Sequence, residues 1–415
     1  MKRLALLLGA VAFATNVATA AEPVGELRAK AEAGDAEAQG ILGYFYSDGH
    51  EVTRDKVEAI KWYRQAAEQG NAIAQFNLAV CYDQGNGAEK DSFKAAYWTQ
   101  KAAEQDFVPA QYNLGIYLCK GLGITKNEAE AVKWFQKAAD NGYPDAQYML
   151  GFCHDQGMGV PKNAAEAVRW YKIAAEQGNL SAQFNLAICY EEGTGVQMNA
   201  VEAIRWYRNA AEKGHTKAQS SLGFRYALGI GVDQDGREAA MWYRKAADQG
   251  LVSAQVSLGV LYMKGAILPK DDIEAYAYSN LAASSSTTAR NNRETLEKTL
   301  SREEIAAGQR RTRELQREIE AKSPAAAAPA IPQLGLVATG AVQVTLRRKN
   351  ADDSVGEMVY TGFLAAGESR YVPRQGALFV EASVAENLEL EINGKRYNLG
   401  QMLGTGPRRG NLPAP

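Results

Sequence analysis

The sequence predicts a mainly α-helical protein, in which an α/α solenoid of seven 36-residue repeats precedes a small all-β, sandwich-like C-terminal domain. Three observations lead to this prediction. The dipeptide Ala-Gln recurs seven times at intervals of 36 residues, and all six tryptophans follow the same interval. After a segment rich in proline and alanine, the chain changes to short runs of β-forming residues. A fixed period of about 20–50 residues is typical of solenoids, whose neighbouring repeats cover one another's hydrophobic faces.

Each repeat is predicted to begin with an amphipathic helix. Counted from its glutamine (offset 0), every repeat has leucine at +3 and glycine or alanine at +4, and five have tyrosine at +7. These offsets lie on one face of an α-helix. Glycine at +10 is expected to end the helix in every repeat, because glycine readily adopts the left-handed conformation. The seven glutamines are Gln39, Gln75, Gln111, Gln147, Gln183, Gln219 and Gln255.

A second amphipathic helix is predicted in each repeat. Alanine occupies +20, an aromatic residue +23 and an Ala-Ala pair +27 and +28 in every repeat, which is again the spacing of one helix face. A buried tryptophan removes about 200 Å² from water. One helix pair cannot cover its own apolar face, so we expect the pairs to stack. The residues at +23 are Trp62, Trp98, Trp134, Trp170, Trp206, Trp242 and Tyr278.

The first residues resemble a secretory signal peptide. "MKR" is a positive n-region, "LALLLGAVAF" is a short apolar run, and "ATA" ends at a cleavage site after residue 20. We therefore expect residues 1–20 to be removed and the mature protein to be periplasmic, or secreted; the alternative is a buried N-terminal helix. Residues 21–30 form a lead-in to the repeats, which span 31–283. No later segment is apolar enough to cross a membrane.

The chain beyond the repeats is predicted to have four parts. Residues 284–322 form a polar helical cap, in which "SREE" at Ser301 is a capping box and Arg310, Arg311, Arg313 and Arg317 lie on a solvated face. A Pro/Ala linker follows at 323–333. Residues 334–403 form the β domain, where Asn393-Gly394 predicts a two-residue hairpin turn. We expect 404–415 to be a loose tail.

Several classes of function are not supported by the composition. The formal net charge is −2, which gives no reason to expect a nucleic acid partner. The three histidines have no partner at a catalytic or metal-ligand spacing, and no nucleophile elbow, P-loop or zinc motif is present. We therefore predict no enzyme activity, no cofactor and no metal site.

The repeats resemble a known family. "AQFNLAICYEEGTGVQMNAVEAIRWYRNAAEKG" is similar to a Sel1-like repeat, a relative of the tetratricopeptide repeat. This resemblance implies a right-handed α/α superhelix with a concave groove and a role in protein–protein interaction. The stretch "YTGFLAAGESRYVPRQGALFVEASVAENLELEINGKRYNLG" resembles the periplasmic C-terminal domain of RodZ-type cell-shape proteins. That second resemblance implies a small partner-binding or ligand-binding module linked to the cell envelope.

Offsets +1, +5, +8 and +9 form a second stripe on the first helix, which the tetratricopeptide analogy places in the concave groove. We call these positions the variable stripe, because their residues differ between repeats. Apolar and aromatic residues with an acidic margin would suit an extended peptide that carries basic residues. The alternative is that the aromatic residues pack against the next repeat. The predicted groove residues are Phe76, Val80, Asp83, Tyr112, Ile116, Tyr148, Phe152, Asp155, Phe184, Ile188, Glu191, Glu192 and Phe224.

The four cysteines are expected to be unpaired and largely buried. Cys81, Cys153 and Cys189 occupy +6 and Cys119 occupies +8. Stacked helices lie about 10 Å apart, which is beyond the Cα separation of about 7 Å that a disulfide allows. The alternative is one bridge, Cys81–Cys119 or Cys119–Cys153.

These features predict an exported protein–protein interaction scaffold that binds a segment of a partner, for which cell-envelope proteins are candidates. A secreted or surface effector that binds host proteins is an alternative. An envelope enzyme with its site in the β domain is a weaker one, because residues 334–415 contain no histidine or cysteine. The sequence does not indicate an oligomeric state.

Overall fold

The structure is a computed structural model of the 415-residue chain. It describes residues 23–322, 333–338, 342–349, 355–364, 369–373, 378–383, 388–392, 395–398 and 408–412. The predicted signal peptide, most of the predicted linker and the Asn393-Gly394 turn lie outside these residues. The chain divides into two compact units, Met1–Gln316 and Arg317–Pro415.

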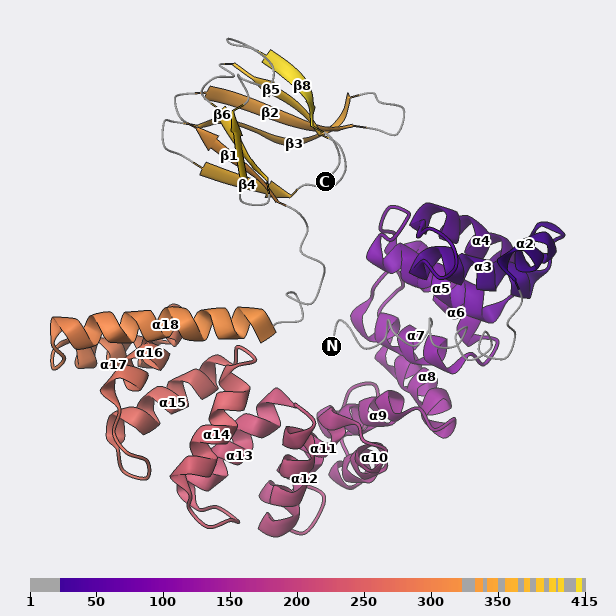
Figure 1. Ribbon diagram of the computed structural model, residues 1–415. Coiled ribbons are helices and arrows are strands. Elements are labelled where there is room, and N and C mark those ends of the chain that lie inside the picture. The colour runs from indigo at the N-terminus through magenta and orange to yellow at the C-terminus, as the bar shows by residue number, and fades with distance from the viewer. Residues whose placement is uncertain are drawn as a thin grey trace. The chain divides into compact units, whose positions relative to one another are not determined.

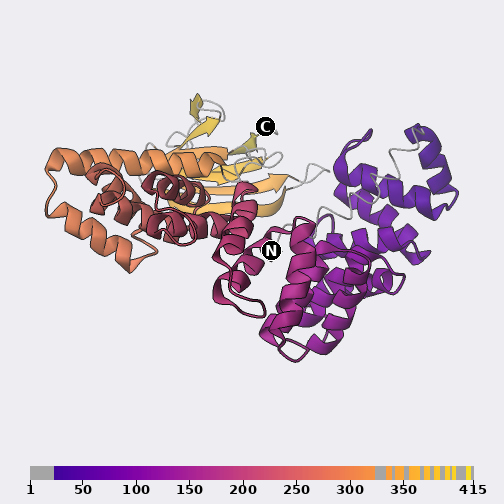
Figure 2. The same cartoon turned by 90° about the horizontal axis from the view of Figure 1, so that it is seen from below.

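The first unit consists of helix pairs in chain order, and each pair packs on the next (Figures 1 and 2). The first helices of the repeats are α3 (Ala36–Asp48), α5 (Ala72–Gln84), α7 (Val108–Lys120), α9 (Pro144–Gln156), α11 (Leu180–Glu192), α13 (Thr216–Leu228) and α15 (Val252–Lys264). The second helices are α4 (Lys56–Glu68), α6 (Ser92–Ala103), α8 (Glu128–Asp140), α10 (Ala164–Glu176), α12 (Ala200–Glu212), α14 (Gly236–Ala247) and α16 (Asp272–Ala282). A preceding helix, α2 (Val24–Glu32), covers most of the expected lead-in. The prediction of a helical repeat solenoid is confirmed.

The helix ends follow from local sequence. Every first helix ends at the glycine of offset +10 in the left-handed conformation, as predicted; Gly157, for example, has φ 71°. Every second helix begins after an aspartate or asparagine at +16, whose side chain accepts hydrogen bonds from the first turn. Asp106 replaces a glycine at the end of one repeat and has φ 59°, a conformation that aspartate tolerates.

The two helices of a repeat pack closely because the residue at +4 is small. A Cβ added to Gly115 would lie 2.5 Å from the Phe135 ring, and one added to Gly151 would lie 2.6 Å from the Tyr171 ring. The leucine at +3 has at most 1% of its surface exposed in every repeat. The core therefore runs along the facing sides of both helices, as the periodicity predicted.

The glutamine at offset 0 joins neighbouring repeats. It is buried in all seven repeats, and in six its Nε2 donates to the carbonyl oxygen of the last helical alanine before it, at 3.0–3.4 Å. In the third repeat Gln111 Nε2 instead donates to Asp106 Oδ1 at 3.0 Å. In all seven repeats the buried Nε2 thus has an acceptor near the end of the preceding helix, which explains why glutamine recurs without exception.

The loop between the two helices passes close to the preceding repeat. Gly159, at +12, has φ 72°, and a Cβ there would lie 2.3 Å from the carbonyl oxygen of Glu128, which begins α8. At the last junction the loop residue is Ile267, and the residue that begins the helix is Gly236, whose added Cβ would lie 1.9 Å from the Ile267 carbonyl oxygen. One of the two partners at such a contact must lack a side chain.

Two helices follow the last repeat, α17 (Thr287–Glu297) and α18 (Arg302–Lys322). The capping box is confirmed, because Ser301 N donates to Glu304 Oε2 at 2.8 Å and Glu304 N donates to Ser301 Oγ at 3.3 Å. The prediction of a solvated arginine face is wrong for Arg311, which forms an ion pair with Glu274 of α16 at 2.8 Å. Leu315 is buried against the last repeat.

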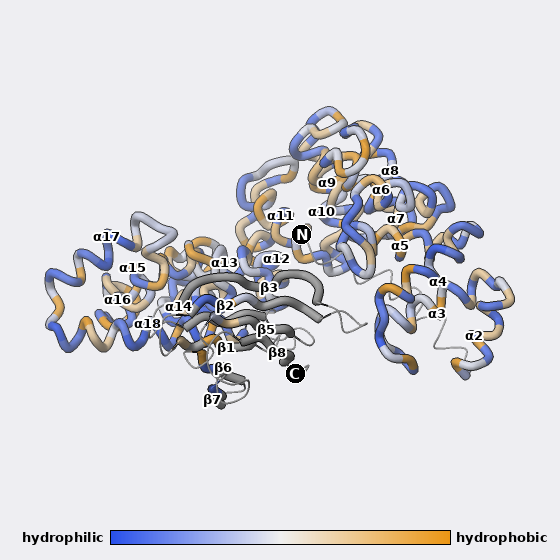
Figure 3. Tube along the Cα trace, turned by 90° about the horizontal axis from the view of Figure 1, so that it is seen from above, coloured by the Kyte–Doolittle hydropathy of each residue, from blue (hydrophilic) through white to orange (hydrophobic). Residues whose placement is uncertain are grey.

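Figure 3 shows apolar stretches along the repeat helices, whereas α17 and α18 are mainly hydrophilic. Within the described part of the chain, no helix is both long and apolar enough to cross a membrane.

The described residues after 332 form two four-stranded sheets, in the orders β4-β1-β6-β7 and β3-β2-β5-β8. Their strands are β1 (Gln333–Ala338), β2 (Val342–Lys349), β3 (Val355–Leu364), β4 (Ser369–Pro373), β5 (Leu378–Ala382), β6 (Leu388–Ile392), β7 (Lys395–Asn398) and β8 (Arg408–Leu412). All pairings are antiparallel. The prediction that residues 404–415 form a loose tail is wrong for β8, which pairs with β5. A sandwich-like domain stays a prediction.

Candidate functional site

The aromatic residues at +1 of the variable stripe pack inside the repeat. Phe76 has no exposed surface, and its ring lies edge-on to Phe107 with centroids 5.3 Å apart. It belongs to a cluster with the next repeat, so the groove prediction is wrong for this residue and the packing alternative holds. The other three +1 rings are half-buried against the ring at +24: Tyr112 on Phe135, Tyr148 on Tyr171 and Phe184 on Tyr207, with centroids 5.8–5.9 Å apart.

The residues at +5 retain more accessible surface. Val80, Ile116, Phe152 and Ile188 are half-buried, and 46% of the surface of Phe224 is exposed. Leu228, one turn after Phe224 on α13, is 55% exposed. The structure thus brings a line of partly accessible apolar side chains onto successive first helices, with its most exposed part in the sixth repeat.

The predicted acidic margin is altered by an arginine. Arg225 occupies +6, is 7% exposed and pairs with Glu191. Tyr207 Oη donates to Glu191 Oε2 at 2.9 Å, and Arg225 also donates to the Ser221 carbonyl oxygen at 2.8 Å. Glu191 is therefore not a free acid for a basic ligand, because its charge is already balanced within the protein. Asp83 and Asp155 are half-buried and Glu192 is exposed.

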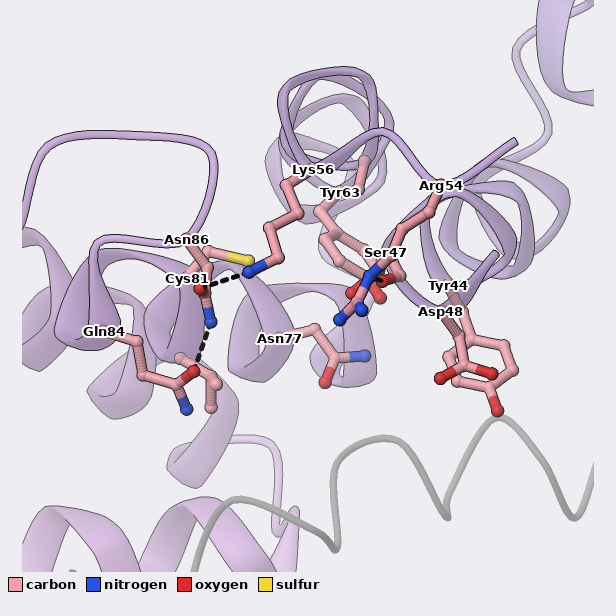
Figure 4. Close-up of a pocket in the computed structure, with 12 residues that line it drawn as sticks. Tyr44, Ser47, Asp48, Arg54, Lys56, Tyr63, Asn77, Cys81, Gln84 and Asn86 are labelled. Atoms are coloured by element: carbon pink, nitrogen blue, oxygen red, sulfur yellow. Dashed lines mark hydrogen bonds between the residues drawn. The ribbon is translucent and has the colours of Figure 1, made fainter. Parts of the chain in front are cut away.

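A polar cavity of about 150 Å³ lies between the first two repeats (Figure 4). Its walls come from α3, α4, α5 and the loops after α3 and α5. Val80 is the only predicted groove residue that lines it. The polar side chains on its walls are Tyr44, Ser47, Asp48, Arg54, Lys56, Tyr63, Asn77, Gln84 and Asn86.

The unusual group in this cavity is the amide of Asn77. Asn77 is 7% exposed, and its Nδ2 has no hydrogen-bond partner. Lys56 Nζ donates to Asn86 Oδ1 and Arg54 Nε donates to the Ser47 carbonyl oxygen, both at 2.9 Å. An unused buried donor beside two cations and the carboxylate of Asp48 can bind a carbonyl or carboxylate oxygen.

The sequence contained signals for these missed residues. Tyr44 and Asp48 occupy +5 and +9 of the first repeat, the same offsets as the predicted stripe. Arg225 is a charged residue at an offset where other repeats have phenylalanine, cysteine, tyrosine or leucine. Neither signal shows that Asn77 lacks a partner, because that depends on the side chains of the neighbouring repeat.

The cysteines and histidines carry no sign of catalysis. All four thiols are free, and burial raises their pKa, to about 12 for Cys81 and Cys153 and to about 11 for Cys119 and Cys189. Thiols with such pKa values are poor nucleophiles at neutral pH. His215 is the N-cap of α13. Among the described residues, no cluster has the ligands of a metal site.

Stacked pairs of helices with a recurrent internal packing scheme define a helical repeat protein of the two-helix solenoid class. The chain belongs to the Sel1 repeat family, which matches it at seven consecutive segments: 36–71, 72–107, 108–143, 144–179, 180–215, 216–251 and 252–286. Sel1 repeat proteins are in general scaffolds for protein interaction. Their fold is not a catalytic one.

One solved structure agrees with this assignment, and a second is reported for its sequence identity alone. A Sel1 repeat protein from Oxalobacter formigenes is 35% identical, with 66% of this chain and 79% of that chain covered and a TM-score of 0.58. A protective antigen present in uropathogenic Escherichia coli strains is 29% identical, with 74% and 82% covered and a TM-score of 0.36. No curated protein matches this chain.

Proposed function

We propose that this protein is an exported scaffold that binds an extended segment of a partner protein along its first helices. The observation that supports this most is the line of +5 side chains, which keep accessible surface in five consecutive repeats and end in exposed Phe224. The residues around them, at +3 and +4, are buried. Repeat proteins use such extended faces to bind peptides.

The cavity between the first two repeats would bind the same segment at one end. Asn77 supplies an unused N–H donor there, and a backbone carbonyl oxygen of the partner is the group that it would bind. Val80 connects the cavity to the apolar line, because it belongs to both. Asp83, Asp155 and Glu192 remain as the acidic margin that would favour basic residues in the partner.

Export is part of this proposal and rests on the signal-peptide pattern of residues 1–20. The resemblance of the C-terminal strands to RodZ-type domains supports a second partner in the cell envelope. Cell fractionation separates this proposal from the effector alternative, because a scaffold of the envelope stays in the periplasm and an effector leaves it.

The test is site-specific photo-crosslinking in cells. A photoreactive amino acid at position 224 should trap a distinct partner protein, whereas the same group at position 93 should not. Phe93 is a suitable control, because it is 77% exposed but lies on a second helix, α6. Equal trapping of the same protein from both positions, or trapping of neither, contradicts binding along the first helices.

The trapped partner then allows a quantitative test. Phe224→Ala with Leu228→Ala should weaken binding about tenfold or more, since each central apolar contact contributes about 1 kcal/mol or more. Phe93→Ala should leave the affinity unchanged. Circular dichroism checks that helicity is the same in both variants, which we expect because all three side chains are exposed.

A further inference from the structure

A second glutamine completes the junction in four repeats. The side chain at +30 is glutamine in these repeats, and its Nε2 donates to Oε1 of the glutamine at offset 0. The pairs are Gln69 to Gln39 at 2.7 Å, Gln105 to Gln75 at 2.8 Å, Gln177 to Gln147 at 2.7 Å and Gln249 to Gln219 at 2.8 Å. In these repeats the buried amide is satisfied at both its nitrogen and its oxygen.

The fifth repeat lacks this second bond. Position +30 is Lys213, whose side chain is exposed. Gln183 Nε2 still donates to the Ala175 carbonyl oxygen at 3.0 Å, but Gln183 Oε1 is buried and has no partner. Gln183 is 3% exposed. In the third repeat, where Gln111 Oε1 is also unpaired, the residue at +30 is Asn141, and its amide donates to the Lys137 carbonyl oxygen at 2.9 Å.

A cavity of about 410 Å³ lies at this incomplete junction, between α10, α11 and α12. Gln183 and Lys213 both line it, together with Glu176, Trp206, Asn209 and Glu212. Its volume falls in the range of about 300–1,000 Å³ that small-molecule sites have. Lys213 can move aside without loss of core packing, because it is exposed.

The other repeats indicate which kind of donor would bind Gln183 Oε1. An unpaired buried carbonyl oxygen costs about 1–3 kcal/mol, so a ligand with an N–H donor is favoured there. In the four repeats with glutamine at +30, the donor to the equivalent oxygen is the planar NH₂ of that glutamine. Two carboxylates, Glu176 and Glu212, outnumber the single ammonium of Lys213 at the cavity. A guanidinium combines a planar NH₂ donor with a positive charge.

We propose that this cavity binds the guanidinium of an arginine, with one of its N–H groups donating to Gln183 Oε1. The carboxylates of Glu176 and Glu212 would balance the charge. This site is distinct from the proposed partner-binding line, so it gives the protein a second recognition element. The arginine can belong to a peptide or be the free amino acid.

The test is calorimetry on the full-length protein with two probes, N-acetyl-arginine methylamide and the neutral N-acetyl-glutamine methylamide. The arginine probe should bind, and Lys213→Gln should weaken it at least about tenfold, because the introduced amide would occupy the acceptor as Gln177 does in the preceding repeat. Lys172→Gln, the same charge change on the exposed side of α10, should have no effect. Side-chain amide NMR signals of Gln183 should shift on binding.

The remaining outcomes either contradict the proposal or show whether the bound arginine is free or part of a peptide. Absence of binding, equal binding of the neutral probe, or full affinity in Lys213→Gln would each overturn it. Tighter binding of free arginine than of the capped probe supports it with the free amino acid as ligand. If Lys213→Gln does not fold, Gln183→Leu removes the acceptor and should also weaken binding at least about tenfold.

Discussion

The fourth and fifth repeats share one backbone plan but differ at a single junction. In the fourth, Gln147 bonds to the Ala139 carbonyl oxygen at 3.3 Å and accepts from Gln177 at 2.7 Å. In the fifth, Gln183 makes the equivalent backbone bond and leaves its oxygen unpaired. The bond from the glutamine Nε2 is thus common to both repeats, and the second bond is where a repeat can differ without changing the fold.

At neutral pH, the largest expected effect comes from removing each glutamine in turn. Gln147→Leu loses two hydrogen bonds and should lower the free energy of unfolding by about 2 kcal/mol. Gln183→Leu loses one bond but also removes an unpaired buried oxygen, so it should cost at least about 1 kcal/mol less. Urea unfolding of both variants measures the difference. Equal losses would mean that the unpaired oxygen in the fifth repeat has no energetic cost.

The buried thiols of the same two repeats predict an alkaline effect. The pKa of Cys153 rises from 9.0 in the unfolded chain to about 12 in the folded protein, so only the unfolded state loses this proton between those values. Stability should therefore fall above pH 9, by about 1.4 kcal/mol per pH unit for this thiol. For Cys189 the pKa is about 11, and its contribution should end about one pH unit earlier.

The measurement is urea unfolding at pH 8, 10 and 11 for the parent protein and for Cys153→Ala. The variant should lose less stability than the parent between pH 8 and 11. Tyrosine ionisation contributes equally to both proteins, so it cancels in the comparison. An identical pH dependence would show that Cys153 titrates normally in the folded state.

The smallest effect is expected from converting the fourth repeat into the state of the fifth. Gln177→Lys removes the donor to Gln147 Oε1 and should cost about 1 kcal/mol, with the helices unchanged. The control is Gln156→Lys, which places the same lysine at an exposed position on α9. A thermal midpoint that falls equally in both variants would indicate an effect of charge and not of the lost hydrogen bond.

Much of the first unit could be predicted from the sequence, because the same contacts recur. Leucine at +3, the small residue at +4 and glycine at +10 each have one packing role, and seven copies make that role visible. The capping box at Ser301 was likewise predictable, since both of its partners lie within four residues. The strand β8 was missed, because its pairing with β5 depends on contacts distant in sequence.

The candidate site was less predictable, because its properties depend on departures from the repeat. Spacing placed Phe76 and Phe224 on the same stripe, yet one is buried and the other exposed. Phe76, at +1, packs on Phe107, whereas Phe224 lies at +5, where side chains keep accessible surface; the spacing within one helix does not show these tertiary contacts. Glu191 was predicted as part of an acidic margin, but its pairing with Arg225 arises between two repeats.

The contact between Gly236 and Ile267 limits how the repeats could be rearranged. At the junction of the third and fourth repeats, the glycine of the contact is Gly159 in the loop, and the residue at the helix start is Glu128. At the last junction the glycine is Gly236 at the helix start, and the loop residue is Ile267. A seventh repeat moved behind the third would bring Ile267 against Glu128, with no glycine on either side. Shuffling, duplication or engineered exchange of these repeats should therefore succeed only when each loop stays together with the second-helix start of the repeat before it.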